Sequence, residues 1–238
     1  MESDPVVTTI ISQYGHEALL ERAVASWLAQ SCGAWRLIIV NDDPRVWFAN
    51  VWHDGRISVH NNMARRRGQS RSYNMALPTV HTPLVAFMGA DDEVLPNRAA
   101  VLREAVAWYA ADVYYTSALY CRGDECEVYG AKPWSPASYG HGNYVCAGTV
   151  AYATAHLARA DARFATWMRR GEDYVFFARA AAGARVRPLA DVTYKYNLGT
   201  GTAGVGHWQT WPGVRSVYRE VLQGMVRGIL RKGAAQWT

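Results

Sequence analysis

The 238-residue sequence has no long hydrophobic run. Its longest apolar segments are short, such as "LIIV" at residues 37–40, whereas a transmembrane helix needs about 20 predominantly apolar residues. The first residues, "MESDPVV", are acidic, and no apolar segment followed by a small-residue cleavage site is present, so we expect no secretory signal. The sequence therefore predicts a cytoplasmic protein whose contact with a membrane, if any, is peripheral.

Cysteine is also scarce. The sequence has four cysteines, none of them in a C-x-x-C pair, which is too few for a disulfide framework. This pattern suits a reducing compartment and predicts free thiols. The four residues are Cys32, Cys121, Cys126 and Cys146.

Charged residues make up only 19% of the chain and hydrophobic residues 50%, which indicates one compact soluble domain or two fused halves with a substantial core. The net charge of +5 is concentrated in "ARRRGQSR", residues 64–71, and in the last thirty or so residues. No helix-turn-helix, RNP-like or zinc-finger pattern accompanies this basic run, so we expect no nucleic-acid partner. A solvated loop and a site for a phosphate-bearing small molecule both remain open.

Strand-like and helix-like segments alternate through the first 90 residues. Such alternation predicts a parallel sheet covered on both faces, with ligands bound beyond the carboxyl ends of the strands. The predicted strands are residues 6–12, 35–43, 56–61 and 83–89, and the predicted helices are residues 16–30 and 70–80.

Acidic residues follow two of these strands. Asp42 and Asp43 end one strand, and Asp91, Asp92 and Glu93 follow another in "FMGADDEVLP". Two strand ends with acids, and a basic loop between them in sequence, fit a nucleoside diphosphate, with carboxylates for the base or ribose and a divalent metal for the phosphates. The alternative is a polar turn, in which Asp91 or Asp92 caps a helix that begins near residue 96.

Five segments, in this order and spacing, resemble family-2 glycosyltransferases of the GT-A fold over about residues 6–202. The resemblance implies an α/β, Rossmann-like fold with a mixed, mainly parallel sheet flanked by helices. It also implies inverting transfer of a sugar from a nucleoside diphosphate sugar, a UDP-sugar favoured, to a hydroxyl of a glycan, glycolipid or small molecule. The segments are "TTIISQYGHEALLERAVASWLAQS", "WRLIIVNDDP", "GQSRSYNMAL", "FMGADDEVLP" and "GEDYVFFARAAAGARV".

The same resemblance assigns different roles to three segments of the chain. Residues 1–111 would bind the nucleotide sugar, residues 112–205 would bind the acceptor within the same domain, and residues 206–238 would form a loop and an amphipathic helix. Within the donor half, the acid after the second strand would read the base, the arginine would approach the base or diphosphate, and the asparagine would stiffen its loop. The residues expected to bind the donor are Gln13, Tyr14, Asp42, Asp43, Arg71, Asn74, Ala90 and Asp91.

The metal segment departs from the family pattern, because Gly89 replaces the first acid of the D-x-D motif. Asp91 matches the second acid, which implies that it binds Mn²⁺ or Mg²⁺, with Asp92 beside it as a second expected metal ligand. A hard divalent cation accepts few carboxylates when waters and substrate phosphates complete its shell. The segment "GTGTAGVGHW", residues 199–208, is either a flexible linker or a lid over the diphosphate, in which His207 would add a metal or phosphate contact.

The segment "GEDYVFFARAAAGARV" places Glu172 and Asp173 just before a helical stripe, where the helix dipole favours ionised carboxylates. They are either ordinary acids at a helix start or, as the resemblance implies, the general base Asp173 and its supporting neighbour Glu172. Trp134, in "KPWSP", either stacks on a sugar face or packs in the core.

Residues 214–232 form an amphipathic, basic stretch. It packs on its own domain, pairs with a second copy of the chain, or lies on an anionic membrane. Two other functions remain open. One is a sugar nucleotidyltransferase, which would normally carry a Gly-rich basic phosphate loop near its first strand. The other is a non-catalytic nucleotide-sugar-binding module, which is compatible with a glycine in place of an acid at position 89.

Overall fold

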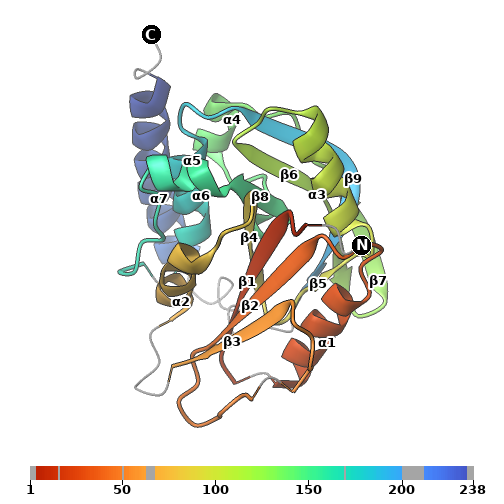
Figure 1. Cartoon of the computed structure of the whole chain (residues 1–238). Helices are drawn as coiled ribbons and strands as arrows, with labels where there is room; N and C mark the ends of the chain where they lie inside the picture. The colour runs from red at the N-terminus through yellow and green to blue at the C-terminus, as the bar shows by residue number, and fades with distance from the viewer. Residues whose placement is uncertain are drawn as a thin grey trace.

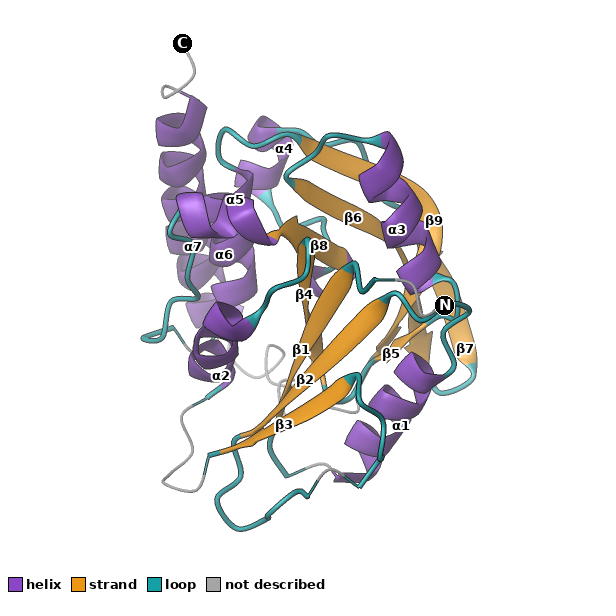
Figure 2. Ribbon diagram, viewed as in Figure 1, coloured by secondary structure: helices purple, strands orange, loops and turns teal. Residues whose placement is uncertain are grey.

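The computed structural model describes residues 4–15, 17–49, 51–62, 68–168, 170–199 and 212–234, with side chains of the last segment from 219 to 233. Within these residues one sheet of nine strands curls between two groups of helices (Figures 1 and 2). The strands are β1 (Val7–Gln13), β2 (Trp35–Asn41), β3 (Ile57–Asn61), β4 (Leu84–Gly89), β5 (Glu93–Val94), β6 (Val113–Arg122), β7 (Glu125–Tyr129), β8 (Val150–Ala153) and β9 (Val186–Asn197).

The described helices are α1 (Glu17–Leu28), α2 (Gln69–Ala76), α3 (Arg98–Trp108), α4 (Pro136–His141), α5 (Thr154–Arg159), α6 (Glu172–Ala181) and α7 (Pro212–Ala234), with short 3₁₀ turns at η1 (Leu77–Thr79) and η2 (Ala147–Thr149). The expected mixed α/β fold is confirmed. Each predicted strand and helix of the first 90 residues is present, with ends that differ by a few residues.

The sheet order is β3-β2-β1-β4-β8-β6-β9-β5, with β7 paired to β6. Strands β3, β2, β1 and β4 are parallel, whereas β8 runs antiparallel to both β4 and β6. Gln13 is opposite Asn41, and Ser12 is opposite Gly89, so the carboxyl ends of β1, β2 and β4 share one edge. This register brings the two acidic segments to one place.

Alternate residues of the central strands face opposite helical layers, as the period of two in a strand requires. Ile10 lies in the core beneath α2 and α6, whereas Ile11 lies in the core beneath α1 and α3. Both side chains are fully buried. The two layers explain why the central strands are apolar on both sides.

The last helix, α7, packs on its own domain through α4 and α6. Its buried side chains, Leu222, Val226 and Leu230, belong to the core beneath α6, and each such burial contributes roughly 1.5–3 kcal/mol. The fit is close, because a Cβ added at Gly171 would lie 2.7 Å from the Leu222 side chain. Of the three expectations for this stretch, packing on its own domain is therefore confirmed for the described side chains, while a second copy and a membrane stay untested.

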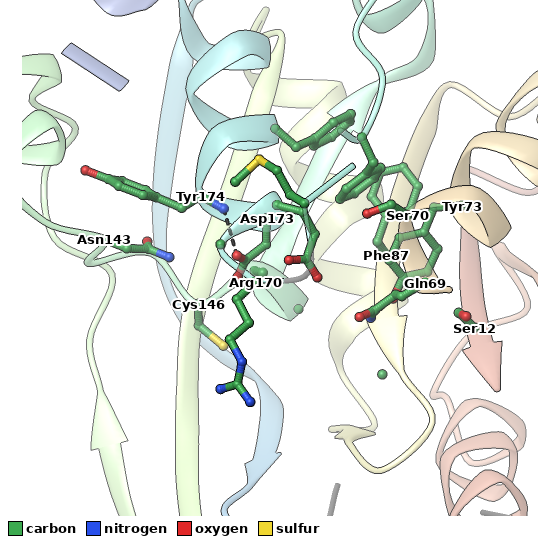
Figure 3. Close-up of a pocket in the computed structure, with 18 of the residues that line it drawn as sticks. Ser12, Gln69, Ser70, Tyr73, Phe87, Asn143, Cys146, Arg170, Asp173 and Tyr174 are labelled. Atoms are coloured by element: carbon green, nitrogen blue, oxygen red, sulfur yellow. Dashed lines mark hydrogen bonds between the residues drawn. The ribbon is translucent and has the colours of Figure 1, made fainter. Parts of the chain in front are cut away.

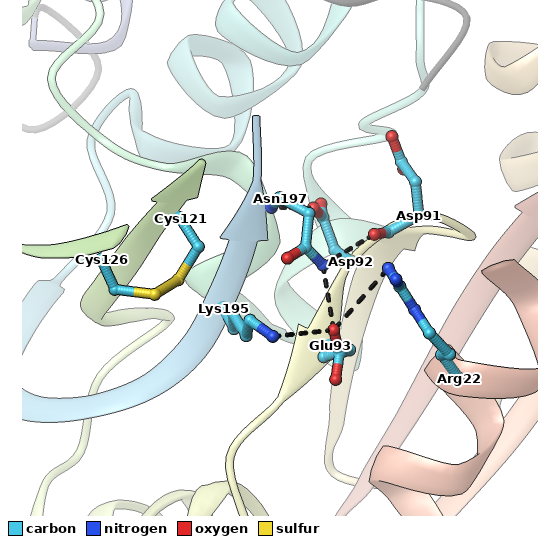
Figure 4. Close-up of a disulfide and its surroundings, with 8 residues drawn as sticks. All are labelled: Arg22, Asp91, Asp92, Glu93, Cys121, Cys126, Lys195 and Asn197. Atoms are coloured by element: carbon cyan, nitrogen blue, oxygen red, sulfur yellow. Dashed lines mark hydrogen bonds and ion pairs between the residues drawn. A yellow bond between two sulfur atoms is a disulfide. The ribbon is translucent and has the colours of Figure 1, made fainter. Parts of the chain in front are cut away.

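A disulfide joins Cys121 and Cys126 (Figure 4), so the prediction of free thiols is wrong for these two residues. They are directly opposite in the antiparallel β6–β7 hairpin, with Cα atoms 4.1 Å apart. The two-residue turn between the strands, which includes Gly123 with a φ of 61°, sets this register. Cys32 and Cys146 are free.

Two further alternatives are settled by the fold. Strand β5 follows the acids, and α3 has Asn97 as its N-cap, so neither Asp91 nor Asp92 caps that helix. Trp134 packs its ring against Tyr139 and Phe177, with centroids 5.4 Å away in both cases, and is a packing residue. No helix in the described segments combines the length and apolar character that crossing a membrane demands.

Candidate active site

A cavity of about 1730 Å³ opens at the carboxyl ends of β1, β2 and β4 and extends to the start of α6 (Figure 3). In the view of Figure 3, Asp173 and Arg170 lie between Asn143 and Cys146 on one side and Gln69 and Ser70 on the other. Among the expected site residues, those that line the cavity are Tyr14, Asp42, Arg71, Ala90, Asp91, Asp92, Glu172 and Asp173.

Asp42 lies at the end of β2 with only 2% of its surface exposed. Its carboxylate accepts hydrogen bonds from the side-chain amide of Asn62, at 2.7 Å, and from the backbone N–H of Gly68, at 2.6 Å. These two hydrogen bonds fix the orientation of the carboxylate. Asp42 is therefore a fixed acceptor at the cavity wall, suited to an N–H group of a base.

Asp43, the neighbouring acid, does not line the cavity. Its carboxylate accepts the backbone N–H of Arg45 at 3.0 Å and binds the Arg45 guanidinium through two further hydrogen bonds. This is an Asx-turn closed by an ion pair. The Arg45 guanidinium also lies over the ring of Tyr14, 5.4 Å from its centroid, so Asp43 supports Tyr14 from behind the cavity wall.

Gln13 and Asn74 also lie outside the cavity lining. Gln13 is fully buried, and its side-chain amide has no hydrogen-bond partner among the described residues. The amide of Asn74 bonds the backbone of Phe164 twice, donating to its carbonyl and accepting from its N–H, each at 2.9 Å. Asn74 thus fixes the loop that precedes α6, whereas Arg71, on the same helix α2, is exposed at the cavity.

The position of Asp91 explains the glycine at 89. A Cβ added at Gly89 would lie 2.5 Å from the Oδ1 atom of Asp91 and 3.5 Å from Oδ2 of Asp92. The Asp91 carboxylate therefore occupies the space that a side chain at 89 would need. The residue that departs from the family pattern is the one that allows Asp91 to adopt this position.

Asp92 is buried and turned toward β9 (Figure 4). Its carboxylate accepts the Tyr194 hydroxyl at 2.8 Å and the Asn197 backbone N–H at 3.0 Å. Burial, together with the charge of Asp91, raises the pKa of Asp92 to about 7. The next acid, Glu93, binds Lys195 at 3.2 Å and Arg22 at 3.7 Å, so both acids tie the turn after β4 to other elements.

The chemistry of these residues decides whether a divalent cation fits. No three His, Cys, Asp or Glu side chains of the described segments form a ready-made metal cluster, and His207 lies outside those segments. Mg²⁺ and Mn²⁺ sites that include substrate phosphates need only one or two carboxylates. Asp91 at the cavity wall, with Asp92 behind it, fits a cation that arrives with a diphosphate.

Glu172 and Asp173 form the first turn of α6, after Gly171 with a φ of 71°. The Tyr174 N–H donates to Asp173 Oδ1 at 2.8 Å. Burial nevertheless raises the pKa of both carboxyls, and the charge of Asp173 adds to the increase at Glu172. The expectation that the helix dipole would favour their ionised forms is wrong in its net effect, because dehydration outweighs it.

Some cavity residues have no counterpart in the sequence prediction. The second half of the chain contributes Tyr194, Asn197 and Cys146 to the cavity lining. The same lining includes Asp91 and Asp92, which follow β4. Strand β9 alternates aromatic and polar residues in "YKYN", a signal of a half-buried strand but not of a contact with Asp92. Trp167, also in the cavity lining, lies in a turn closed by the hydrogen bond from the Met168 N–H to the Ala165 carbonyl.

The sequence is similar to a known protein family and to a named protein of that kind. The sequence pattern described as glycosyl transferase family 2 matches residues 8–170. WcaA of Escherichia coli (strain K12), named as a glycosyl transferase of colanic acid biosynthesis, is 24% identical over 192 residues, which cover 75% of this chain and 67% of WcaA.

Two solved structures that hold nucleotide sugars share this fold. S. aureus TarS 1–349 with UDP-GlcNAc has a TM-score of 0.72 at 17% identity, over 96% of this chain and 71% of that one. The mannosyltransferase PcManGT from Pyrobaculum calidifontis, with GDP-Man and Mn²⁺, has a TM-score of 0.61 at 16% identity, over 98% and 74% of the two chains. In two other TarS structures, the matched region covers 60% of the TarS 1–349 chain and 37% of the chain in the structure named TarS.

Proposed function

The chain belongs to glycosyl transferase family 2, and from this membership we propose that it transfers a sugar, with inversion, from a nucleoside diphosphate sugar to an acceptor hydroxyl. A UDP-sugar is the favoured donor. The acceptor hydroxyl belongs to a glycan, a glycolipid or a small molecule.

One observation carries the proposal. Asp42 directly follows β2, Asp91 lies in the turn after β4, and Asp173 lies in α6, yet all three line one cavity. Packing alone does not require three carboxylates to converge, because like charges repel and buried carboxylates are costly. A nucleotide sugar uses all three, with Asp42 at the base, Asp91 at the diphosphate and Asp173 at the acceptor hydroxyl.

The donor half of the site binds and orients the nucleotide sugar. Asp42 accepts from the base, Tyr14 contributes an aromatic wall, and the guanidinium of Arg71 faces the negative charge of the leaving diphosphate. A bound Mn²⁺ or Mg²⁺ would neutralise charge on the diphosphate oxygens as the sugar leaves, with Asp91 holding it and Asp92 supporting the turn. We assign this half to residues 1–111, and acceptor binding to residues 112–205.

Asp173 acts as the general base. It accepts the proton of the acceptor hydroxyl while the hydroxyl oxygen attacks the anomeric carbon from the face opposite the diphosphate. The raised pKa of Asp173 makes it a stronger proton acceptor than an ordinary carboxylate, although it must still be ionised at the working pH. Glu172 is its supporting neighbour, and the charge of Asp173 contributes to the raised pKa of Glu172.

Two measurements test the proposal. Calorimetric titration with UDP, GDP and dTDP, each with and without Mn²⁺, should give metal-strengthened binding of one nucleotide. Asp173→Asn should keep that binding and lose roughly 10²–10⁴-fold in turnover. Asp161→Asn is the control, because Asp161 is exposed, lies outside the cavity lining and tolerates asparagine at its φ of 42°.

The outcomes separate the remaining functions. Binding of a nucleotide without transfer or donor hydrolysis would favour a non-catalytic module. Wild-type turnover in Asp173→Asn would remove Asp173 from the role of base. A folded protein that binds none of the three nucleotides would refute the donor site.

A further inference from the structure

Three tryptophans are strongly exposed in the described part of the chain. Trp108 is 81% exposed, Trp167 69% and Trp47 65%. Of these, Trp167 alone lines the cavity. Exposure of a large apolar side chain is ordinary on a protein surface, so the location inside the cavity distinguishes Trp167 from the other two.

The loop that carries Trp167 is firmly anchored three residues before it. The Phe164 ring stacks on Phe176 of α6, with centroids 3.9 Å apart and an angle of 1° between the planes. The backbone of Phe164 is held on both sides by the amide of Asn74. An exposed indole on an anchored loop loses little conformational freedom when a ligand covers it.

The loop then leads directly into the acidic start of α6. Trp167 and its neighbours Thr166 and Met168 line the same cavity as Asp173, six residues further along the chain than Trp167. A general base must lie within hydrogen-bond reach of the acceptor hydroxyl. Since the segment that carries Trp167 runs into the start of α6, where Asp173 lies, we expect its cavity-lining residues to contact the acceptor rather than the nucleotide.

We propose that Trp167 is the stacking platform for the acceptor and that the acceptor group at this position is a pyranose ring. This inference rests on the proposed glycosyl transfer. One face of a pyranose presents C–H groups with slight positive charge, which are attracted to the electron-rich face of an indole. The ring hydroxyls need polar partners, and the same cavity offers His141, Asn143 and Gln223.

The test is saturation-transfer NMR on the full chain, with UDP and Mn²⁺ present or absent. The probes are the methyl glycosides of glucose, galactose, mannose and N-acetylglucosamine, with glycerol as a hydroxyl compound that has no ring. We expect Trp167→Ala to bind the preferred glycoside about tenfold or more weakly, Trp167→Phe to retain most of the affinity, and Trp108→Ala to match wild type. Loss of the indole face removes an apolar contact of this order.

A parallel UDP titration keeps the two proposals apart. If Trp167→Ala binds glycosides as Trp108→Ala does, or if wild type binds every glycoside no better than glycerol, the platform is refuted even when nucleotide binding is intact. If no nucleotide binds but the glycosides still require Trp167, the donor site fails and the sugar platform stands. A fall in melting temperature of Trp167→Ala by more than a few degrees, with Trp108→Ala unchanged, would identify a packing role and overturn the proposal.

Discussion

Gly89→Ala is the substitution for which the structure makes its sharpest prediction. The added methyl would lie 2.5 Å from Oδ1 of Asp91, closer than a carbon and an oxygen can approach. Since the obstructing atom is the end of a side chain, the carboxylate can rotate away while the backbone stays in place. We therefore expect the fold to survive and the cation contact of Asp91 to weaken.

The size of the effect follows from the rotation. Forcing a side chain about 30° from its rotamer costs roughly 0.5–1.5 kcal/mol. Since 1.4 kcal/mol is tenfold in an equilibrium constant, the Kd of UDP measured with Mn²⁺ should rise by about 2- to 10-fold in Gly89→Ala. The Kd measured without Mn²⁺ should hardly change, because the altered contact is the one made through the cation.

Calorimetry of wild type, Gly89→Ala and Gly130→Ala measures the effect. Gly130 is a matched control, since a Cβ there meets nothing within 4 Å. Equal Mn²⁺-dependent affinities in all three proteins would refute the reasoning.

Gly89→Asp sharpens the same test, because it restores the acid of the family pattern. The Cβ of that aspartate would lie 2.5 Å from Oδ1 of Asp91, as the methyl of Gly89→Ala does, so the new carboxylate displaces the Asp91 carboxylate instead of joining it. We expect Gly89→Asp to bind UDP with Mn²⁺ no more tightly than wild type. Tighter binding would mean that the glycine only removes a carboxylate ligand of the cation and does not make room for Asp91.

Three further predictions concern the structure around the site. Gly148→Ala should cost about 1–3 kcal/mol of unfolding free energy, because its Cβ would lie 2.1 Å from the Tyr194 ring; Gly130→Ala again serves as control in thermal melts, and equal melting temperatures would contradict the prediction. Reducing the Cys121 disulfide should cost about 2 kcal/mol by chain entropy, so an unchanged melting temperature in dithiothreitol would argue against the pairing. The turnover rate should fall with decreasing pH at a midpoint above the usual carboxyl pKa of about 4, since the raised pKa of Asp173 protonates the base earlier on acidification; Asp173→Asn should abolish that limb.

The part of the fold predicted from the sequence is the part that depends on local pattern. The β-branched run of β1 and the apolar stripe of α1 each specify an element through neighbours in sequence. Parallel alternation then places the carboxyl ends of strands together, which is why Asp42 and Asp91 could be assigned to one site before their positions were known. Neither inference needed a contact between distant segments.

The errors come from contacts that no local pattern encodes. Asp42 and Asp43 are equivalent in sequence, yet Asn62 and Gly68 hold the first at the cavity, whereas Arg45 closes a turn on the second. The disulfide was missed although "CRGDEC" contains its signal, a Gly-containing two-residue turn between cysteines.

Two opposing effects act on the pKa of Asp173, and the larger one raises it. A helix N-terminus stabilises a carboxylate by about 0.3–1 kcal/mol, less than one pKa unit, whereas burial can raise a carboxyl pKa by up to 3–5 units. Helix α7 reaches the start of α6, because the Leu222 side chain lies 2.7 Å from where a Cβ of Gly171 would be and lines the same cavity as Asp173. We therefore expect this last helix to contribute to the dehydration that raises the pKa of Asp173, the carboxylate proposed to activate the acceptor. If so, Leu222→Ala should lower the pH midpoint of turnover as well as the stability, whereas Leu230→Ala, on the same buried stripe but outside the cavity lining, should lower only the stability.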